Sequence, residues 1–221
     1  MLGLGTGIIL ITLLFAFLAT VIFREAFTHR FWQRKVDEGD LDMITQLVQI
    51  EVQRWRTERP PKGMPASIWQ GIQNVELVDV DREYVRASTT AEPQFALVAG
   101  QRRQVSSALD EAKRVTAKLA ERFFYDIPHI RPARVQIDCY TTVQDGGAVS
   151  QCCVMTTVAH RADAAQIDWE VDPPGVIAER LGARYETDSR GAALPVEPEE
   201  PEVRVSTNGK HNGTSVPSDL R

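Results

Sequence analysis

The chain begins with an uninterrupted apolar stretch. Residues 2–23 include no charged side chain, and the stretch ends at Arg24 and Glu25. At about 1.5 Å of rise per residue, a helix of this length reaches across the roughly 30 Å hydrocarbon layer of a bilayer. Because a chain in lipid must satisfy its own backbone hydrogen bonds, the pattern predicts a single transmembrane helix over residues 1–23. The side chains expected to hold it in lipid are Ile8, Leu10, Leu13, Leu14, Phe17, Val21 and Phe23.

A cleaved secretory signal is the alternative interpretation of this stretch. Such a signal needs a basic region before a shorter apolar core, followed by a small-x-small cleavage site. Here no Lys or Arg precedes the apolar stretch, and the nearest candidate site, Phe17-Leu18-Ala19, has a bulky residue where a small one is required. These features favour an uncleaved anchor.

Basic and aromatic residues follow the apolar stretch, over residues 24–39. Aromatic rings prefer the level of the lipid headgroups, and cations at that level meet anionic lipid. Since basic residues stay on the cytoplasmic side, we expect a cell-membrane protein with its N-terminus outside and its C-terminal domain in the cytosol. A helix that simply continues into water is the alternative. The residues expected at the membrane interface are Arg24, Arg30, Trp32, Arg34 and Lys35.

Residues 40–185 show two long helical patterns. Asp40 is a suitable N-cap, and apolar residues then recur at the helical period to Trp55, although Ile50 falls on the polar side. Ser107 and Asp110 suit the start of the second helix, which is expected to end near residues 124–125. Shorter helical segments are expected over residues 66–72, 162–170 and 174–185.

Alternating apolar and polar positions predict strands between these helices. Strands are expected over residues 75–80, 84–89 and 95–99 as an antiparallel meander, with a slip of phase between Leu77 and Val78 that indicates a bulge or a strand buried on both faces. Residues 135–143 and 150–160 flank Asp145-Gly146-Gly147, a strong hairpin signal. The pattern therefore predicts an α+β fold, with antiparallel strands and packed helices in one cytosolic domain.

Three cysteines, Cys139, Cys152 and Cys153, fall in the predicted hairpin. A turn at Asp145-Gly146 places Cys139 opposite Cys152, and a turn at Gly146-Gly147 places it opposite Val154. Both registers put Cys139, Cys152 and Val154 on the same face, which is the more apolar one. Three cysteines are too few for a disulfide framework, and reduced thiols fit the cytosol. We expect buried structural thiols, with a thiol-based redox sensor as the alternative.

Residues 186–221 are rich in Pro and Glu and then in Ser, Asn and Gly, with almost no large apolar side chain. Such a segment cannot offset its ordering entropy by burial, so a disordered tail is expected.

Composition narrows the classes of function. The net charge of −5 argues against a dedicated nucleic-acid-binding protein. No phosphate-binding, dinucleotide-binding, zinc-protease or nucleophile-elbow motif occurs, so neither a cofactor nor a metal is expected. A membrane-tethered hydrolase that uses His129 or His160 with a nearby carboxylate is a further alternative.

The leading hypothesis is a membrane-anchored, non-catalytic scaffold or binding module that works within a membrane-associated complex. Its expected partners are the lipid bilayer and other membrane or membrane-associated proteins. Gly3 and Gly7 have the spacing that lets two transmembrane helices approach closely, which is compatible with a homo-oligomer; flexible glycines at a helix end are the alternative.

Two segments resemble a known family. Phe31-Trp32 followed by Glu38-Gly-Asp-Leu-Asp42, together with the later strand over residues 75–80, is similar to the opening of the cone-shaped domains of the nuclear transport factor family and its membrane-anchored mitochondrial import relatives. The resemblance covers about a quarter of the chain and implies a binding role rather than catalysis. The helix expected over residues 107–124 falls where those families carry strands, so we do not assign the chain to them.

Overall fold

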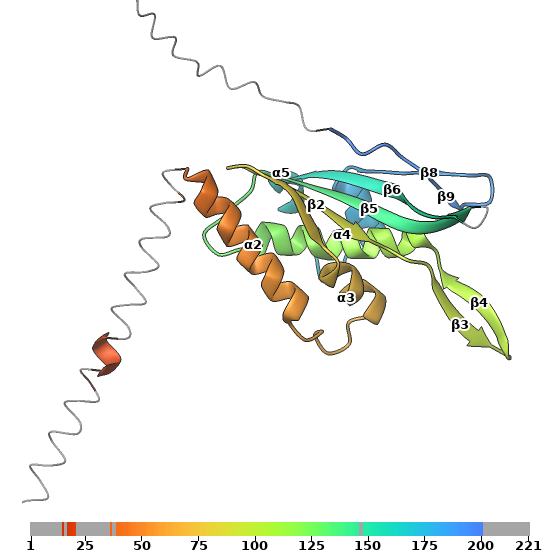
Figure 1. Cartoon of the computed structure of the whole chain (residues 1–221), viewed down its shortest axis with the longest axis horizontal. Coiled ribbons are helices and arrows are strands. Elements are labelled where there is room, and N and C mark those ends of the chain that lie inside the picture. The colour runs from red at the N-terminus through yellow and green to blue at the C-terminus, as the bar shows by residue number, and fades with distance from the viewer. Residues whose placement is uncertain (1–14, 16, 21–35, 37–38, 146–147, 201–221) are drawn as a thin grey trace, which may run out of the picture.

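A five-stranded mixed sheet forms the centre of the domain (Figure 1). The computed structural model describes residues 15, 17–20, 36, 39–145 and 148–200. The strands lie in the order β1-β2-β5-β6-β7, and all neighbours are antiparallel except β2 and β5, which are parallel. The predicted α+β class is confirmed, with a mixed rather than an antiparallel sheet. The strands of this sheet are β1 (Glu76–Val80), β2 (Tyr84–Thr90), β5 (Arg134–Asp145), β6 (Ala148–His160) and β7 (Ala183–Arg184).

The parallel pair arises because the chain leaves the sheet after β2. It forms a separate hairpin of β3 (Gln94–Val98) and β4 (Gln101–Ser106), continues through helix α4 (Ala108–Tyr125), and returns as β5 beside β2. A parallel neighbour requires such a long crossover. The predicted meander is therefore wrong in its third strand, since β3 pairs with β4 and not with the main sheet.

Three helices cover one face of the sheet. They are α2 (Leu41–Thr57), α3 (Ala66–Gln73) and α4, and their apolar stripes form the core with the inward residues of β2, β5 and β6. Trp55 of α2 and Phe123 of α4 are completely buried and meet edge to face, with ring centroids 5.1 Å apart. Because both long helices carry a continuous apolar stripe, the core lies between them and the sheet.

The predicted helix starts are confirmed. Asp40 accepts a hydrogen bond from the backbone N–H of Met43, at 3.2 Å. Ser107 and Asp110 form a reciprocal capping box at the start of α4. The two shorter helices near the C-terminus, α5 (Arg161–Ala164) and α6 (Pro174–Arg180), are shorter than the segments expected over residues 162–170 and 174–185.

Two bulges set the register of the sheet. The predicted slip between Leu77 and Val78 is a bulge: pairing passes from Leu77 with Ala87 to Asp79 with Arg86. In the β5–β6 hairpin a second shift pairs Cys139 with Met155. Neither predicted partner of Cys139 is therefore right, because this bulge adds a residue to β6 that the turn alone does not reveal.

Residues 186–200 cross the face of the sheet that the helices leave open (Figure 1). They include the paired strands β8 (Glu186–Thr187) and β9 (Ala193–Leu194), and the Val196 N–H donates to the Cys153 carbonyl at 2.9 Å. The expectation of disorder is wrong for this part, because backbone hydrogen bonds order it without large apolar side chains. We call residues 195–200 the strap. Residues 201–221 lie outside the described part.

Part of the predicted anchor lies among the described residues. Phe15 and residues 17–20 are helical, and the side chains of Phe15, Phe17 and Leu18 are exposed. No helix within the described part of the chain has the length and hydropathy to cross a membrane. The remaining predicted anchor and interface residues lie outside the described ones: Ile8, Leu10, Leu13, Leu14, Val21, Phe23, Arg24, Arg30, Trp32, Arg34 and Lys35.

Gly71 of α3 allows that helix to approach α4 closely. A Cβ atom at this position would lie 2.6 and 2.7 Å from the two methyl groups of Val115. We expect Gly71→Ala to destabilise the domain by about 1–3 kcal/mol in urea unfolding, because the added methyl overpacks the contact. Combining it with Val115→Ala should give a smaller loss than the sum of the two single losses.

Gly175 of α6 is the matched control for this prediction. A Cβ there would have no neighbour within 4 Å, so Gly175→Ala should leave stability unchanged or raise it slightly. Equal effects of alanine at Gly71 and Gly175 would contradict the close approach of α3 to α4.

Candidate functional site

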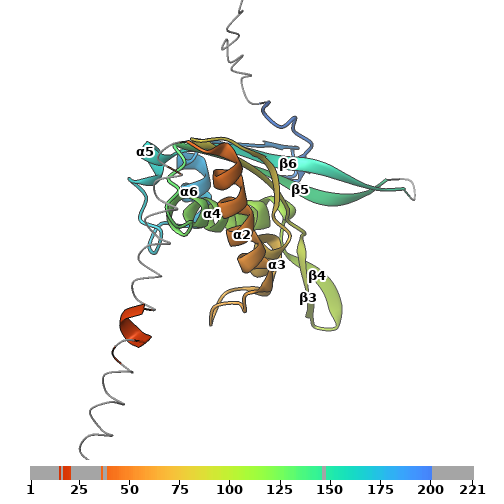
Figure 2. The same ribbon diagram turned by 60° about the vertical axis from the view of Figure 1, so that its left-hand side comes forward.

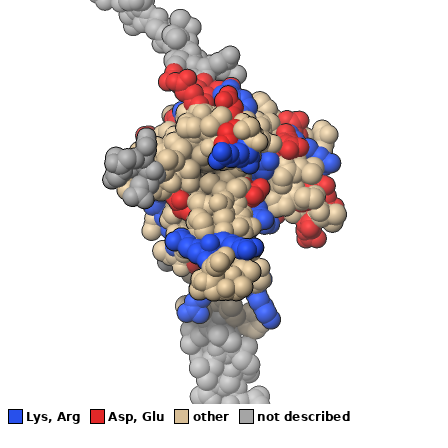
Figure 3. All heavy atoms as spheres, turned by 90° about the vertical axis from the view of Figure 1, so that its right-hand side faces the viewer, with Lys and Arg blue, Asp and Glu red and all other residues tan. Residues whose placement is uncertain are grey.

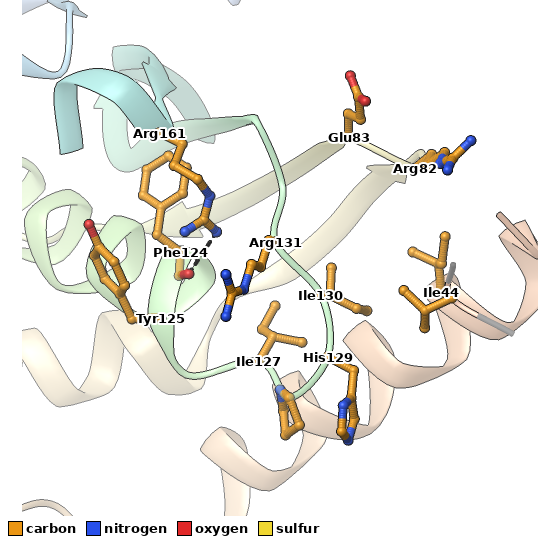
Figure 4. A pocket seen from close by; sticks show the side chains of 12 residues that line it. Ile44, Arg82, Glu83, Phe124, Tyr125, Ile127, His129, Ile130, Arg131 and Arg161 are labelled. Atoms are coloured by element: carbon orange, nitrogen blue, oxygen red, sulfur yellow. Dashed lines mark hydrogen bonds between the residues drawn. The ribbon is translucent and has the colours of Figure 1, made fainter. Parts of the chain in front are cut away.

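A cleft of about 890 Å³ opens at the end of the domain where α2 begins (Figure 4). Four parts of the chain line it: the start of α2, the β1–β2 turn, the end of α4 with the loop that leads to β5, and Arg161 at the start of α5. The lining residues include Val36, which lies just before α2, so the cleft is next to the point where the N-terminal segment joins the domain.

Two arginines approach each other at this cleft. The Arg161 guanidinium donates from Nη2 to the Phe124 carbonyl at 2.7 Å and from Nε to the Pro132 carbonyl at 2.9 Å, which satisfies the C-terminal end of α4. Burial lowers the pKa of Arg161, and the positive charge of Arg131 lowers it further. In Figure 4 the two guanidinium groups point toward the same part of the cleft. Two like charges are thus held close together at this site.

Arg131 has no counter-charge in the described part of the chain. Its side chain is exposed and forms no hydrogen bond or ion pair with any other described residue. Glu83 is the one carboxylate among the lining residues, and Figure 4 shows its carboxylate pointing away from Arg131 and Arg161. The cleft therefore offers a positive site to an anion.

Several apolar side chains also line the cleft. Ile44, Ile127 and Ile130 are almost completely buried, and Pro128 of the same loop is a further lining residue. His129 lies in the same loop with a φ of 65°, in the left-handed region that residues other than Gly rarely adopt. The isoleucines thus support the cleft from the core, and the surface that they expose to a ligand is small.

A buried polar network lies on the sheet face opposite the helices. Asp138 is almost completely buried; it accepts from Arg86 Nε at 2.8 Å and from the Thr156 hydroxyl at 2.6 Å. Gln136 accepts from the Tyr84 hydroxyl at 2.6 Å and donates to the Glu199 carbonyl of the strap at 2.6 Å. Burial raises the pKa of Tyr84 to about 12, so its hydroxyl stays protonated as a donor. The strap covers this network, whose members satisfy one another, and we interpret it as structural.

The three cysteines belong to the sheet rather than to a reactive site. Cys139 is buried and lies 3.1 Å from the Thr116 hydroxyl; burial raises the pKa of its thiol to about 12. Burial also raises the pKa of Cys153 to about 11. Cys139 pairs with Met155, and Cys152 pairs with Thr141, so no two cysteines are paired across the hairpin. Cys152 is half-buried at the edge of the core.

We expect Cys152 to react with iodoacetamide before Cys139 or Cys153 in the folded protein at pH 8. The thiolate is the reactive form, and a raised pKa means that less of it exists; with a pKa near 11, thiolate is only about one thousandth of Cys153 at this pH. Peptide-resolved mass spectrometry measures the three rates, and urea should make them similar. Rapid alkylation of all three in the folded protein would contradict the structural interpretation and favour a thiol sensor.

The structure does not join the two histidines into a hydrolytic centre. His129 lines the cleft, whereas His160 ends β6 with an exposed side chain that forms no hydrogen bond or ion pair within the described residues. Among those residues, no group of three metal-ligating side chains is gathered either. The hydrolase alternative remains a prediction without a supporting contact at His160.

The β3–β4 hairpin forms a second candidate surface, which the sequence did not reveal. It projects from the domain at the end opposite the start of α2 (Figures 1 and 2), and Arg114 Nη1 ties its base to α4 through the Ser106 hydroxyl at 3.3 Å. Arg102 lies over the ring of Phe95, 4.3 Å from its centroid. Viewed from this end, uncharged residues cover much of the surface, with patches of Lys and Arg and others of Asp and Glu (Figure 3). The exposed apolar side chains of the hairpin are Phe95, Leu97, Val98 and Val105.

Comparison with known proteins finds no counterpart for the chain. No family model, no curated protein and no solved structure matches it.

Proposed function

We propose that this protein is a single-pass membrane protein whose α+β domain binds other proteins at the membrane surface. The β3–β4 hairpin is its contact surface for a partner, and residues 1–23 are its anchor. The observation that carries the proposal is the hairpin, whose exposed side chains are apolar and basic. It projects from the end of the domain opposite the start of α2, and the start of α2 is the end that follows the apolar segment.

The apolar segment supports the anchor. Its described residues Phe15, Phe17 and Leu18 are helical and expose large apolar side chains, which is costly in water and favourable in lipid. The basic residues that follow favour an N-terminus outside and a domain in the cytosol. The free thiols of Cys139, Cys152 and Cys153 fit a domain that keeps its cysteines reduced.

The hairpin supports protein binding. An isolated two-stranded hairpin is at best marginally stable in water, and its outer edges present unpaired backbone groups. Leu97 is 79% exposed and Val105 is 61% exposed. Residues 94–106 include two arginines and no acidic residue. These features suit an extended partner segment with apolar and acidic side chains that adds as a strand to the hairpin.

Site-specific photo-crosslinking in intact membranes tests this function. With the photoreactive residue at Leu97 of the full chain, we expect a discrete protein adduct that weakens when Arg102 and Arg103 are both replaced by Glu. The control position is Val171, which is 76% exposed and lies near Trp169, a residue that packs against Tyr125 at the opposite end of α4. The same adducts from both positions, or none from Leu97, would overturn the binding role of the hairpin.

A further inference from the structure

The cleft at the start of α2 lies where the segment that follows the proposed anchor enters the domain. Val36 lines it, and the chain enters α2 through Gly39 and Asp40 immediately afterwards. If residues 1–23 span the bilayer, as proposed above, this end of the domain is the end nearest to the lipid headgroups. The inference below rests on that proposed anchor for the source of the ligand, although not for its chemistry.

The cationic part of the cleft is built to receive an anion with several oxygens. Arg161 is fixed by the Phe124 and Pro132 carbonyls through Nη2 and Nε, and its Nη1 has no hydrogen bond within the described residues. Arg131 adds a second guanidinium beside it, which forms no ion pair with any described residue. Guanidinium groups bind phosphate oxygens through two parallel N–H donors, and such charge-assisted bonds are about twice as strong as neutral ones.

The position of the cleft distinguishes its ligand from a free anion. Ile44, Ile127 and Ile130 line one wall, and each exposes 4% or less of its surface, whereas Tyr125 beside Arg161 is 49% exposed. Aromatic rings prefer the level of the lipid headgroups, and this end of the domain faces them when residues 1–23 span the bilayer. We propose that this cleft binds the phosphate headgroup of an anionic lipid, with the phosphate on Arg131 and Arg161 and the Tyr125 ring beside it.

Protection of Arg131 from the arginine reagent phenylglyoxal tests this proposal on the full chain in neutral-detergent micelles. The probes are dioctanoyl phosphatidic acid, uncharged dioctanoylglycerol and inorganic phosphate, and peptide-resolved mass spectrometry measures each labelling rate. With phosphatidic acid at ten times its Kd, we expect Arg131 labelling to fall about tenfold, as site occupancy requires. Arg59, an exposed arginine just after α2, is the internal control and should label at an unchanged rate.

A photoreactive phosphatidic acid gives a second measurement with matched variants. Its labelling of the 127–131 loop should fall about tenfold in Arg131→Ala, because one charge-assisted phosphate contact is lost. The same labelling should be unchanged in Arg59→Ala, which removes an exposed charge at another place.

The outcomes separate the sources of the phosphate. Protection by phosphatidic acid alone supports the proposal. Equal protection by inorganic phosphate would overturn the lipid assignment in favour of a soluble phosphate, and equal protection by dioctanoylglycerol would overturn the role of the arginines. If no probe protects Arg131, the proposal fails. Membrane retention of the chain is measured separately. If the chain stays in membranes but phosphatidic acid does not protect Arg131, the lipid site in the cleft is refuted and the anchor is not. If phosphatidic acid protects Arg131 but the chain does not stay in membranes, the anchor is refuted and the lipid-binding cleft is not.

Discussion

Replacing Asp138 by alanine should destabilise the domain by about 3–5 kcal/mol, the usual loss when one partner of a buried ion pair is removed. Asp138 is 1% exposed and accepts hydrogen bonds from Arg86, Gln136 and Thr156. Without it the Arg86 guanidinium, whose side chain is 15% exposed, stays in the sheet with no counter-charge. Urea unfolding of the full chain in detergent, followed by tryptophan fluorescence, measures the loss.

A surface ion pair provides the control for this prediction. Lys118 and Glu121 of α4 are 2.6 Å apart, with side chains 39% and 31% exposed, so Lys118→Ala should cost less than about 1 kcal/mol. Replacing both members of the buried pair, Arg86→Met with Asp138→Leu, should cost less than Asp138→Ala alone because no charge is left buried. Similar losses for Asp138→Ala and Lys118→Ala would contradict the structural role of the network.

Replacing Trp55 by alanine should destabilise the domain by a comparable amount, about 3–5 kcal/mol. Trp55 is completely buried between α2 and α4, and its ring packs edge to face on Phe123. Its indole N–H also donates to Glu51 at 3.0 Å, and Glu51 is itself 4% exposed. The substitution removes the largest side chain of the α2 stripe and leaves a cavity that the neighbouring helices fill only in part.

Ile50 supplies the matched control on the same helix. It is 54% exposed on the opposite side of α2, so Ile50→Ala should change stability by no more than about 0.5 kcal/mol. A loss at Trp55 as small as that at Ile50 would mean that α2 does not pack on α4 through this stripe.

The features that depend on local sequence were predictable. Asp40 and Ser107 cap their helices because a short polar side chain before an apolar stripe satisfies the first free backbone donors. The slip of phase between Leu77 and Val78 indicated a bulge, which the pairing of β1 with β2 confirms. In each case the signal and the structure it produces lie within a few residues.

The features that depend on distant segments were not predictable. β4 shows no alternation because Gln101 to Gln104 are all polar, so its pairing with β3 left no sequence signal. The parallel pairing of β2 with β5 follows from the route of the chain between them. The cleft is likewise formed by residues far apart in sequence, such as Ile44, Arg131 and Arg161, and no spacing in the chain joins them.

Residues 186–200 show why composition alone misled. Scarcity of large apolar side chains predicted disorder, yet the Glu199 carbonyl accepts from Gln136, and the Arg184 guanidinium donates to the Glu197 carbonyl at 3.3 Å. Buried polar groups of the sheet need hydrogen-bond partners, and a segment that supplies them becomes ordered. The need for these partners arises from residues of the sheet, so the composition of the segment does not reveal it.

Extraction of isolated membranes at alkaline pH tests the anchored domain most directly. The full chain is compared with a variant that lacks residues 2–23, and immunoblotting follows each in pellet and supernatant. Because an apolar helix in the bilayer resists extraction, we expect the full chain to stay in the pellet and the shortened chain to be released. Release of the full chain together with the shortened one would contradict a membrane-anchored binding module.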